Sequence, residues 1–298
     1  MEEFTASIVI TTKNRKAELS NAIESCLKLK GDPEIFVFDD GSDDGTIELV
    51  KNKFPSVRLY RENLSLGLID ARTKAATLVQ GNIIFTLDDD AVFSDENIVL
   101  DIISDFKIPA IGAVAIPLIN IKYSQDIIQK APDTNGTYII SQYIGTAHAL
   151  RKDVFLKLGG YRNSLVRQNE ESDYCIRMLD AGYFVKLGTS APIIHYESPA
   201  RDRKLIKFYE ARNNIIFSLR NVPNVFLIFH LTFNIVNIFR SRDGYLLSVT
   251  KGIYCGMIDF LHNKKMKRKP VKIRTYMLFR KLRRRMILLS SLKTIIKD

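Results

Sequence analysis

Short apolar runs alternate with helix-like segments through the first 120 residues, and this alternation leaves few folds open to the chain. β-Branched and aromatic runs predict strands at 7–12, 34–40, 57–61, 82–89 and 110–119. Between them, apolar residues at helical spacing predict helices at 15–29, 43–54, 67–79 and 95–106. Strands that are apolar almost throughout are typical of a parallel sheet covered on both faces. We therefore predict an α/β fold with a Rossmann-like, mostly parallel sheet.

The second half of the chain is less regular and ends in helices. We predict a helix at 170–182, strands at 183–188 and 192–197, and helices from residue 202 onward. The segment 222–239 is strongly apolar, but His230, Asn234 and Asn237 fall on one helical face. That spacing favours an amphipathic or interface helix over a lipid-embedded span, which needs about 20 nearly unbroken apolar residues. We predict an α/β domain at 1–220, divided at residue 119 into two halves, and a helical extension at 221–298.

The positive charge is concentrated at the C-terminus. The chain carries a net charge of +11, while residues 261–298 alone hold 14 Lys or Arg and one acidic residue. Apolar residues recur among these cations at three- and four-residue steps: Tyr276, Leu278, Phe279, Leu282, Met286, Leu289 and Leu292. A basic amphipathic helix of this kind suits an anionic membrane surface.

Two other interpretations of this tail were weighed. A nucleic acid attracts the same charges, but the tail is aliphatic as well as basic and the body shows no recognition motif. We therefore expect no nucleic-acid partner. A solvated helical face remains an open alternative. The preferred hypothesis is a peripheral protein on the cytoplasmic face of the cell membrane.

Cysteine usage and the N-terminus bear on the compartment. Cys26, Cys175 and Cys255 are far apart, odd in number and without metal-ligand spacing, so we expect reduced thiols that serve in packing. The opening MEEFTASIVITT has no basic region followed by a long apolar stretch, so we expect no signal peptide. Both features favour a cytosolic protein.

Acidic clusters follow two of the predicted strands. Asp39 and Asp40 end one strand, and the triplet Asp88–Asp90 ends another. Ligands of open parallel sheets bind outside the carboxyl ends of the strands, so we expect both clusters to face one crevice. Helix capping and turns explain Asp43 and Asp44, and at most one residue of the triplet. A divalent cation, Mn²⁺ or Mg²⁺, bound together with a diphosphate would offset the repulsion within the triplet.

Seven motifs, taken together, resemble those of a known family. In chain order they read IVITTKNR, VFDDGSDDGT, GLIDARTKAA, FTLDDDAV, LGGYRN, NEESDYCIRMLDAGY and HYESPARD followed by YEARNN. They extend from residue 7 to about residue 214 and resemble the inverting, family-2 glycosyltransferases with the GT-A-type fold. The resemblance implies a nucleotide-sugar donor linked to UDP, dTDP or GDP, and a glycan or lipid-linked acceptor in the synthesis of a cell-surface polysaccharide. It also implies that the half at 1–119 binds the donor and that 120–220 holds the acceptor and the catalytic groups.

The resemblance assigns donor and metal roles by matching position. Thr11 and Asp40 would hold the nucleobase, with Asn14 and Arg15 nearby, and Arg72 would reach the base or the diphosphate. Asp88 and Asp90 match the ends of the DxD motif, which contact ribose and metal, and Asp89 shares in this role. His195 matches a position that completes the metal shell, although a lone His beside an apolar strand more often serves in packing or capping.

The catalytic base is predicted at the start of the helix at 170–182. An acceptor hydroxyl needs a group that takes its proton, and a positioned carboxylate is suited to this. By position Glu171 is the base, Glu170 is its neighbour and Asp173 is the later acid of the motif. The simpler alternative is that these acids favour the positive end of the helix dipole.

Further residues of the second half have weaker assignments. His148 belongs to a segment that resembles the acceptor-side wall, and Gly159 and Gly160 permit a tight turn. Three more residues are interpreted as supporting the site or facing phosphate: Arg201, Arg212 and Asn213.

Two other functions were weighed. A nucleotidyltransferase also places acidic metal ligands on a Rossmann-like layer, but it needs a glycine-rich loop after the first strand, and TTKNRKAEL has no glycine. A non-catalytic relative would keep the fold without activity, and the retained acidic clusters count against it.

Overall fold

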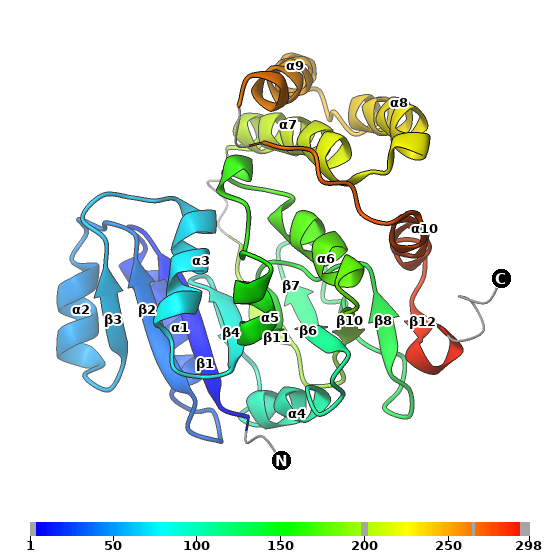
Figure 1. Cartoon of the computed structure of the whole chain (residues 1–298). Coiled ribbons are helices and arrows are strands. Elements are labelled where there is room, and N and C mark those ends of the chain that lie inside the picture. The colour runs from blue at the N-terminus through cyan, green and yellow to red at the C-terminus, as the bar shows by residue number, and fades with distance from the viewer. Residues whose placement is uncertain (1–3, 198–201, 264–265, 293–298) are drawn as a thin grey trace.

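A computed structural model describes residues 4–197, 202–263 and 266–292 of the chain. Within this part, a nine-stranded sheet has the order β12-β8-β10-β6-β9-β4-β1-β2-β3 (Figure 1). Its strands are β1 Ala6–Thr12, β2 Glu34–Asp39, β3 Arg58–Arg61, β4 Ile83–Asp88, β6 Ile111–Ala115, β8 Tyr138–Ile140, β9 Ala147–Arg151, β10 Phe184–Leu187 and β12 Ile287–Leu288. A second, three-stranded sheet joins β5 Ala91–Phe93, β11 Ile193–His195 and β7 Leu118–Asn120.

The half of the sheet formed by β4, β1, β2 and β3 is parallel, and the other half is mixed. β1 lies between β2 and β4 and is parallel to both, and β3 continues the parallel order beyond β2. β9 is antiparallel to its neighbours β4 and β6, and β8 is antiparallel to β10 and β12. The predicted parallel sheet is thus confirmed for the first four strands. The antiparallel insertion of β9 was not predicted.

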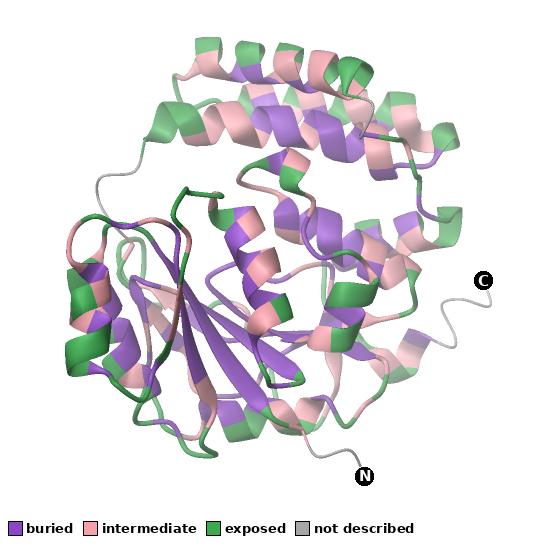
Figure 2. Ribbon diagram, turned by 60° about the vertical axis from the view of Figure 1, so that its left-hand side comes forward, coloured by how far each residue is buried: buried purple, intermediate pink, exposed green. Residues whose placement is uncertain are grey.

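Helices cover both faces of the sheet, as the strand composition predicted. They are α1 Lys16–Cys26, α2 Thr46–Lys53, α3 Leu68–Leu78, α4 Ile98–Asp105, α5 Lys152–Lys157 and α6 Glu170–Asp180, with a 3₁₀ turn η1 at Asn163–Leu165. In β1, Ile8 and Ile10 pack with α1 and α4, whereas Val9 packs with α3 and α5 on the opposite face. Every residue of β1 is buried, and the central strands are buried along most of their length (Figure 2).

A layer of three helices lies at the end of the sheet where β1 and β4 end (Figure 1). These helices are α7 Arg203–Asn221, α8 Asn224–Arg240 and α9 Leu246–His262. α7 and α9 approach closely because Gly252 and Gly256 face α7, where an added Cβ would collide with the carbonyl oxygens of Phe208 and Arg212. Among the described residues, the structure has no helix that is both long and apolar enough to span a bilayer.

The C-terminal segment returns to the α/β body. Helix α10, Ile273–Leu282, packs against α6, then β12 pairs with β8, and a 3₁₀ turn η2 follows at Leu289–Ser291. Tyr276, Phe279 and Leu282 are buried, with exposed fractions of 1–3%. The apolar side chains that the sequence analysis assigned to a membrane contact are therefore largely used in packing, because sequence spacing alone does not tell an internal face from an external one. Cys26 and Cys175 are free and buried, which confirms their predicted packing role.

Candidate active site

The carboxyl ends of β1, β2 and β4 meet at one edge of the sheet. The strand register places Thr11 opposite Asp88 and Thr12 opposite Asp39. The two acidic clusters therefore lie at neighbouring strand ends, as predicted. Asp44 accepts hydrogen bonds from the backbone N–H groups of Thr46 (3.1 Å) and Lys16 (3.1 Å), which confirms its role in the turns that lead into α1 and α2.

Asp89 and Asp90 share one guanidinium. Arg15 approaches Asp89 Oδ1 with one terminal nitrogen (2.9 Å) and Asp90 Oδ2 with the other (3.0 Å). Thr12 Oγ1 donates to Asp89 Oδ2 (2.8 Å), and His195 Nε2 lies 3.0 Å from Asp90 Oδ1. Side chains of the protein thus already supply positive partners and hydrogen-bond donors for these two carboxylates.

Asp88 is held by Arg72 and Thr146. Its Oδ1 accepts a hydrogen bond from Arg72, and its Oδ2 accepts one from Thr146 Oγ1 (2.7 Å). The Arg72 side chain is only 4% exposed, whereas that of Asp88 is 22% exposed and is the more open partner of the pair. Arg72 therefore acts as a buried counter-charge beneath an accessible carboxylate.

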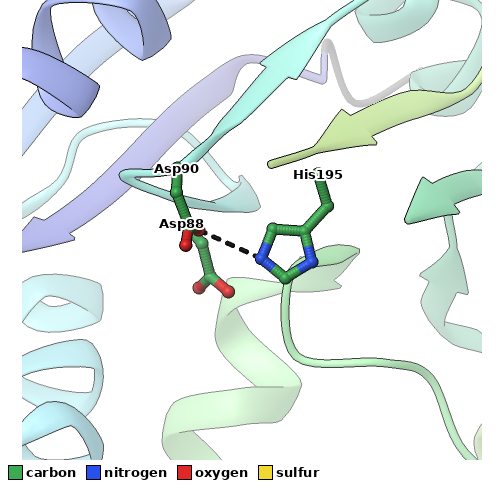
Figure 3. Close-up of side chains that lie close together, drawn as sticks. All are labelled: Asp88, Asp90 and His195. Carbon is green, nitrogen blue, oxygen red and sulfur yellow. Dashed lines mark hydrogen bonds and ion pairs between the residues drawn. The ribbon is translucent and has the colours of Figure 1, made fainter. Parts of the chain in front are cut away.

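Asp88, Asp90 and His195 form the cluster that could hold a metal ion. One ligand atom of each residue lies within 4.8 Å of those of the other two, and the side chains converge on one point (Figure 3). The β5–β11 pairing brings His195 opposite Ala91 and so beside the triplet, and Asn120 Nδ2 lies 3.3 Å from the second ring nitrogen. Two carboxylates and one imidazole are a suitable donor set for Mn²⁺. The residues present therefore fit a divalent ion.

Asp89 and Asp90 differ in how easily they lose a proton. Burial raises the pKa of Asp89 to about 7, even though Arg15 and Thr12 act in the opposite direction. Burial also opposes ionisation of Asp90, but the hydrogen bond from His195 and the charges of His195 and Arg15 outweigh it and lower the pKa of Asp90. Asp90 is therefore the better anionic ligand of the two at neutral pH.

Two of the residues predicted to lie at the nucleobase hold loops in place. Both oxygens of Asp40 are engaged in the loop before α3, where they accept from Ser65 Oγ (2.6 Å) and from the N–H groups of Leu66 (2.7 Å) and Gly67 (3.0 Å). Asp40 thus shapes this loop. Asn14, at a positive φ of 56°, accepts a hydrogen bond from the N–H of Asp43 (2.8 Å) and so ties two loops together.

Two buried oxygens at this edge lack a hydrogen-bond partner among the described residues: Thr11 Oγ1 and Asp39 Oδ2. Arg61 Nε approaches the latter only to 3.9 Å. Buried polar atoms of this kind call for a partner, and a ligand can supply one. Thr11 is one of the predicted nucleobase residues. Asp39 was not among the predicted site residues, although it is the last residue of β2 and the first of its acidic pair.

Glu170 and Glu171 open α6 next to Arg72. Both lie close enough for the charge of Arg72 to act on them, and Glu171 Oε1 fills the space into which a Cβ on Gly145 would project. Burial raises the pKa of Glu171, and the neighbouring charge of Glu170 adds to the shift. A carboxylate with a raised pKa is suited to accept a proton near neutral pH. Arg72 therefore interacts both with Asp88 of the metal-binding cluster and with this acidic pair.

Asp173 is engaged differently from Glu171. It is 1% exposed and forms ion pairs with Arg162 (2.7 Å) and Arg177 (3.0 Å), while Asn221 Nδ2 donates to it (2.8 Å). Burial acts against its ionisation, but Arg177 and Arg162 prevail and lower the pKa of Asp173. These contacts join α6 to α7 and hold the start of α6 in place.

His148, Gly159 and Gly160, which the sequence assigned less firmly, serve to shape the second half of the domain. His148 is fully buried, stacks on Tyr143 (4.1 Å between centroids) and lies 3.1 Å from Tyr161 Oη, so it does not form an open acceptor wall. Gly159 and Gly160 have positive φ angles of 78° and 61°, as the predicted turn requires.

The Arg-Asn pair of α7 also supports the site from behind. Arg212 pairs with Asp259 (2.6 Å), and Asn213 donates to the carbonyl groups of residues 165, 167 and 168, just before α6. Arg201 lies outside the described residues.

The comparisons with known proteins agree with this geometry. The sequence model of glycosyl transferase family 2 matches residues 7–159. The chain belongs to this family. No curated protein sequence matches it.

Solved structures show the same fold at low sequence identity. The mannosyltransferase PcManGT from Pyrobaculum calidifontis, in complex with GDP-Man and Mn²⁺, has a TM-score of 0.61 at 14% identity, with 88% of each chain covered. S. aureus TarS 1–349 in complex with UDP-GlcNAc has a TM-score of 0.62 at 14% identity, covering 92% of this chain and 83% of that one. GalNAc-T7 with UDP, GalNAc and Mn²⁺ has a TM-score of 0.56 at 18% identity, covering 70% and 47%. The protein is a glycosyltransferase with the GT-A-type fold.

Gly145 gives a steric test of this glycosyltransferase site. A methyl group at this position would collide with Glu171 Oε1 and lie 3.1 Å from Arg72. We expect Gly145→Ala to lower the turnover number about 100-fold, since displacing a catalytic group by about 1 Å costs that much. Donor affinity should change far less. Gly136→Ala is the control, because it crowds Leu288 at the far edge of the sheet. Equal turnover in both variants would contradict the position assigned to Glu171.

Proposed function

We propose that this glycosyltransferase moves a sugar, with inversion at the anomeric carbon, from a UDP-, dTDP- or GDP-linked donor to a hydroxyl group. The acceptor is a lipid-linked or polysaccharide glycan in cell-surface glycan synthesis. One observation carries the proposal: a single buried guanidinium, Arg72, pairs with Asp88 of the Asp88–Asp90–His195 cluster and also interacts electrostatically with Glu170 and Glu171. Such a site can bind a nucleoside diphosphate beside a carboxylate able to activate a hydroxyl.

The donor subsite is assigned to the ends of β1 and β2. Thr11 Oγ1 and Asp39 Oδ2, the buried oxygens without partners, would bind the nucleobase, and Asp40 and Asn14 would hold the loops around it. The neighbours of known structure carry GDP-Man or UDP-GlcNAc, which supports a nucleotide sugar as donor. Because these neighbours differ in their nucleotide, the proposal keeps UDP, dTDP and GDP as candidates. Arg15 lies at the rim, beside Asp89 and Asp90, where a diphosphate would arrive.

A divalent cation would be held by Asp88, Asp90 and His195. When bound, it supplies Lewis-acid stabilisation of the charge that gathers on the leaving diphosphate. Thr146 and Arg72 orient Asp88, and Arg15 orients Asp90. Asp89, which is buried against Thr12, then serves chiefly to hold Arg15.

The transfer step requires a base on the acceptor side. Glu171 accepts the proton of the acceptor hydroxyl while the hydroxyl oxygen forms a bond to the anomeric carbon. The bond from that carbon to the diphosphate oxygen breaks, and its electron pair leaves with the nucleoside diphosphate. Glu170 keeps the pKa of Glu171 high by its negative charge, and Asp173 is a positioning residue that anchors α6 through Arg162 and Arg177.

The cell location is part of the proposal. A lipid-linked acceptor would lie at a membrane, and the basic C-terminal segment would draw the protein to an anionic cytoplasmic leaflet. We assign the enzyme to the cytoplasmic face of the cell membrane as a peripheral protein.

Ligand-induced stabilisation tests the donor and metal assignments together. A ligand that binds only the folded state raises the melting temperature. We expect one class of UDP, dTDP or GDP sugar to do so with Mn²⁺ and much less without it. Asp90→Asn should abolish the Mn²⁺-dependent part and lower the rate about 100-fold or more, as expected when metal stabilisation worth about 3 kcal/mol is lost.

Asp101→Asn is the matched control, because Asp101 is an exposed carboxylate on α4. It should behave like the wild type. A melting temperature that no nucleotide sugar changes, with or without Mn²⁺, would refute the proposed donor site.

A further inference from the structure

Helix α8 buries two polar residues and exposes several large apolar ones. His230 and Asn234 are buried, with exposed fractions of 8% and 9%. His230 Nδ1 lies 2.7 Å from Tyr276 Oη, and Asn234 Nδ2 lies 3.0 Å from Ser218 Oγ and 2.9 Å from His230 Nε2. The polar face noted in the sequence is thus used within the protein. A water-exposed helix has the reverse arrangement, with its polar face toward solvent.

The outer face of α8 is a stripe of exposed apolar side chains. They are Val225 (59% exposed), Ile228 (76%), Phe229 (79%), Phe233 (55%) and Val236 (42%). Their spacing along a helix of 3.6 residues per turn keeps them on one side. Contiguous exposed apolar patches of this kind mark sites of interaction. We call these five residues the α8 stripe.

A cationic groove adjoins the α8 stripe. A hollow of about 530 Å³ separates α8 from α10, and Figure 1 shows these two helices at neighbouring positions. The rings of Phe226 and Tyr276 stack there, with centroids 5.1 Å apart. The groove is lined by Phe226, Tyr276, Met277, Arg280, Lys281, Arg284 and Arg285. Within the described part of the chain, no carboxylate forms an ion pair with any of these four cations.

We propose that the α8 stripe and the α8–α10 groove together bind the surface of an anionic lipid bilayer. The stripe enters the boundary between headgroups and acyl chains, and the groove takes the phosphate of a lipid headgroup. Interfacial helices combine an apolar face with cations in this way. The inference deepens the membrane partner of the proposed function and rests on it. It moves the apolar contact from the C-terminal tail, where it was predicted, to α8.

Charge decides between a bilayer and other occupants. In a symmetric dimer the same patch of each copy faces the other, so the interface would enclose the groove cations of both copies, and none of the residues that line the groove is a carboxylate. A nucleic acid would neutralise the cations but would leave the α8 stripe exposed to water. An anionic bilayer satisfies both parts of the surface.

Vesicle cosedimentation of the full chain tests the surface by loss of binding. We expect binding to vesicles of phosphatidylcholine with phosphatidylglycerol, and much less to phosphatidylcholine alone. Phe229→Ser with Phe233→Ser, and separately Arg284→Ser with Arg285→Ser, should each weaken binding at least about tenfold. The matched controls are Leu27→Ser with Leu100→Ser and Lys28→Ser with Lys51→Ser, at exposed positions of the α/β body. They should bind like the wild type.

A gain of signal tests the same surface without relying on loss of binding. The chain contains no Trp. Phe229→Trp therefore places a single fluorophore on the α8 stripe, and its emission should shift to shorter wavelength when anionic vesicles are added. Leu27→Trp should show no such shift.

Several outcomes would overturn the inference. The first is that the intact chain does not bind anionic vesicles. The second is that the stripe and groove variants bind these vesicles as well as the wild type does. The third is that the emission of Phe229→Trp does not shift when the vesicles are added. A dimer in light scattering that the stripe variants convert to monomer, with vesicle binding unchanged, would assign the stripe to a second copy. Donor hydrolysis measured without vesicles reports on the transferase separately, so a failure there leaves this result unaffected.

Discussion

Glu171→Gln should abolish sugar transfer while the enzyme still binds its donor. The substitution keeps the shape of the side chain but removes its ability to accept a proton. General-base catalysis contributes about 10²–10⁴-fold to a rate, so the turnover number should fall by that factor. The proposed donor contacts are Thr11, Asp39 and the metal-binding cluster, so nucleotide-sugar stabilisation in a melting experiment should be unchanged.

The pH profile of the wild type provides the control for this result. Burial and the charge of Glu170 raise the pKa of Glu171, so the active, ionised form predominates only at higher pH. Turnover should therefore rise with pH through a value above that of an ordinary glutamate, about 4.3, and this rise should disappear in Glu171→Gln. Full turnover in the variant would reject the assignment. Loss of turnover in Glu170→Gln alone would transfer the role of base to Glu170.

The first four strands could be predicted because each is a local pattern in the sequence. β1, β2 and β4 each have a run of buried apolar residues, and the helices between them require parallel order, so the meeting of Asp39 and Asp88 at one edge followed directly. β9 and β12 could not be placed in this way. Both pair with strands remote in sequence, and β12 has only two residues, so no local pattern identifies its partner.

The charges of the site show a different limit. The aspartate triplet was correctly predicted to need positive partners, and a divalent cation was the predicted partner. The structure supplies Arg15 and Arg72 as well, because α1 and α3 begin directly after the loops that follow β1 and β3. Sequence spacing does not reveal which arginine reaches which carboxylate. Sequence spacing also does not reveal that the oxygens of Asp40 accept hydrogen bonds from a loop about 25 residues further along the chain.

Arg72→Met should have the largest effect on both stability and activity. The Arg72 side chain is 4% exposed and is the charge that Asp88, Glu170 and Glu171 share. Removing one partner of a buried ion pair typically costs about 3–5 kcal/mol, because the remaining charge is left buried without compensation. Methionine fills a similar volume, so the loss measures the missing charge rather than a cavity. Transfer should fall to background, because both the metal-binding cluster and the base lose their common support.

The pH dependence of unfolding distinguishes this loss of charge from a general packing defect. Without Arg72, the pKa values of Glu170 and Glu171 in the folded state rise further above their unfolded values. A carboxyl group with a raised folded-state pKa favours folding when protonated, and this contribution is lost as pH rises through the folded-state value. The stability deficit of Arg72→Met should therefore be smallest in acid and should grow toward neutral pH, as measured by urea unfolding at a series of pH values.

Lys53→Met is the control variant for this experiment. The Lys53 side chain is 51% exposed and that of its partner Glu24 is 46% exposed, and ion pairs exposed on both sides contribute little to stability, so its deficit should be much smaller than that of Arg72→Met. A deficit in Arg72→Met that does not vary with pH would mean that Arg72 is not the counter-charge of these carboxylates. The two halves of the site would then have no common support, and the base and the metal ligands would have to be positioned by α6 and β4 independently.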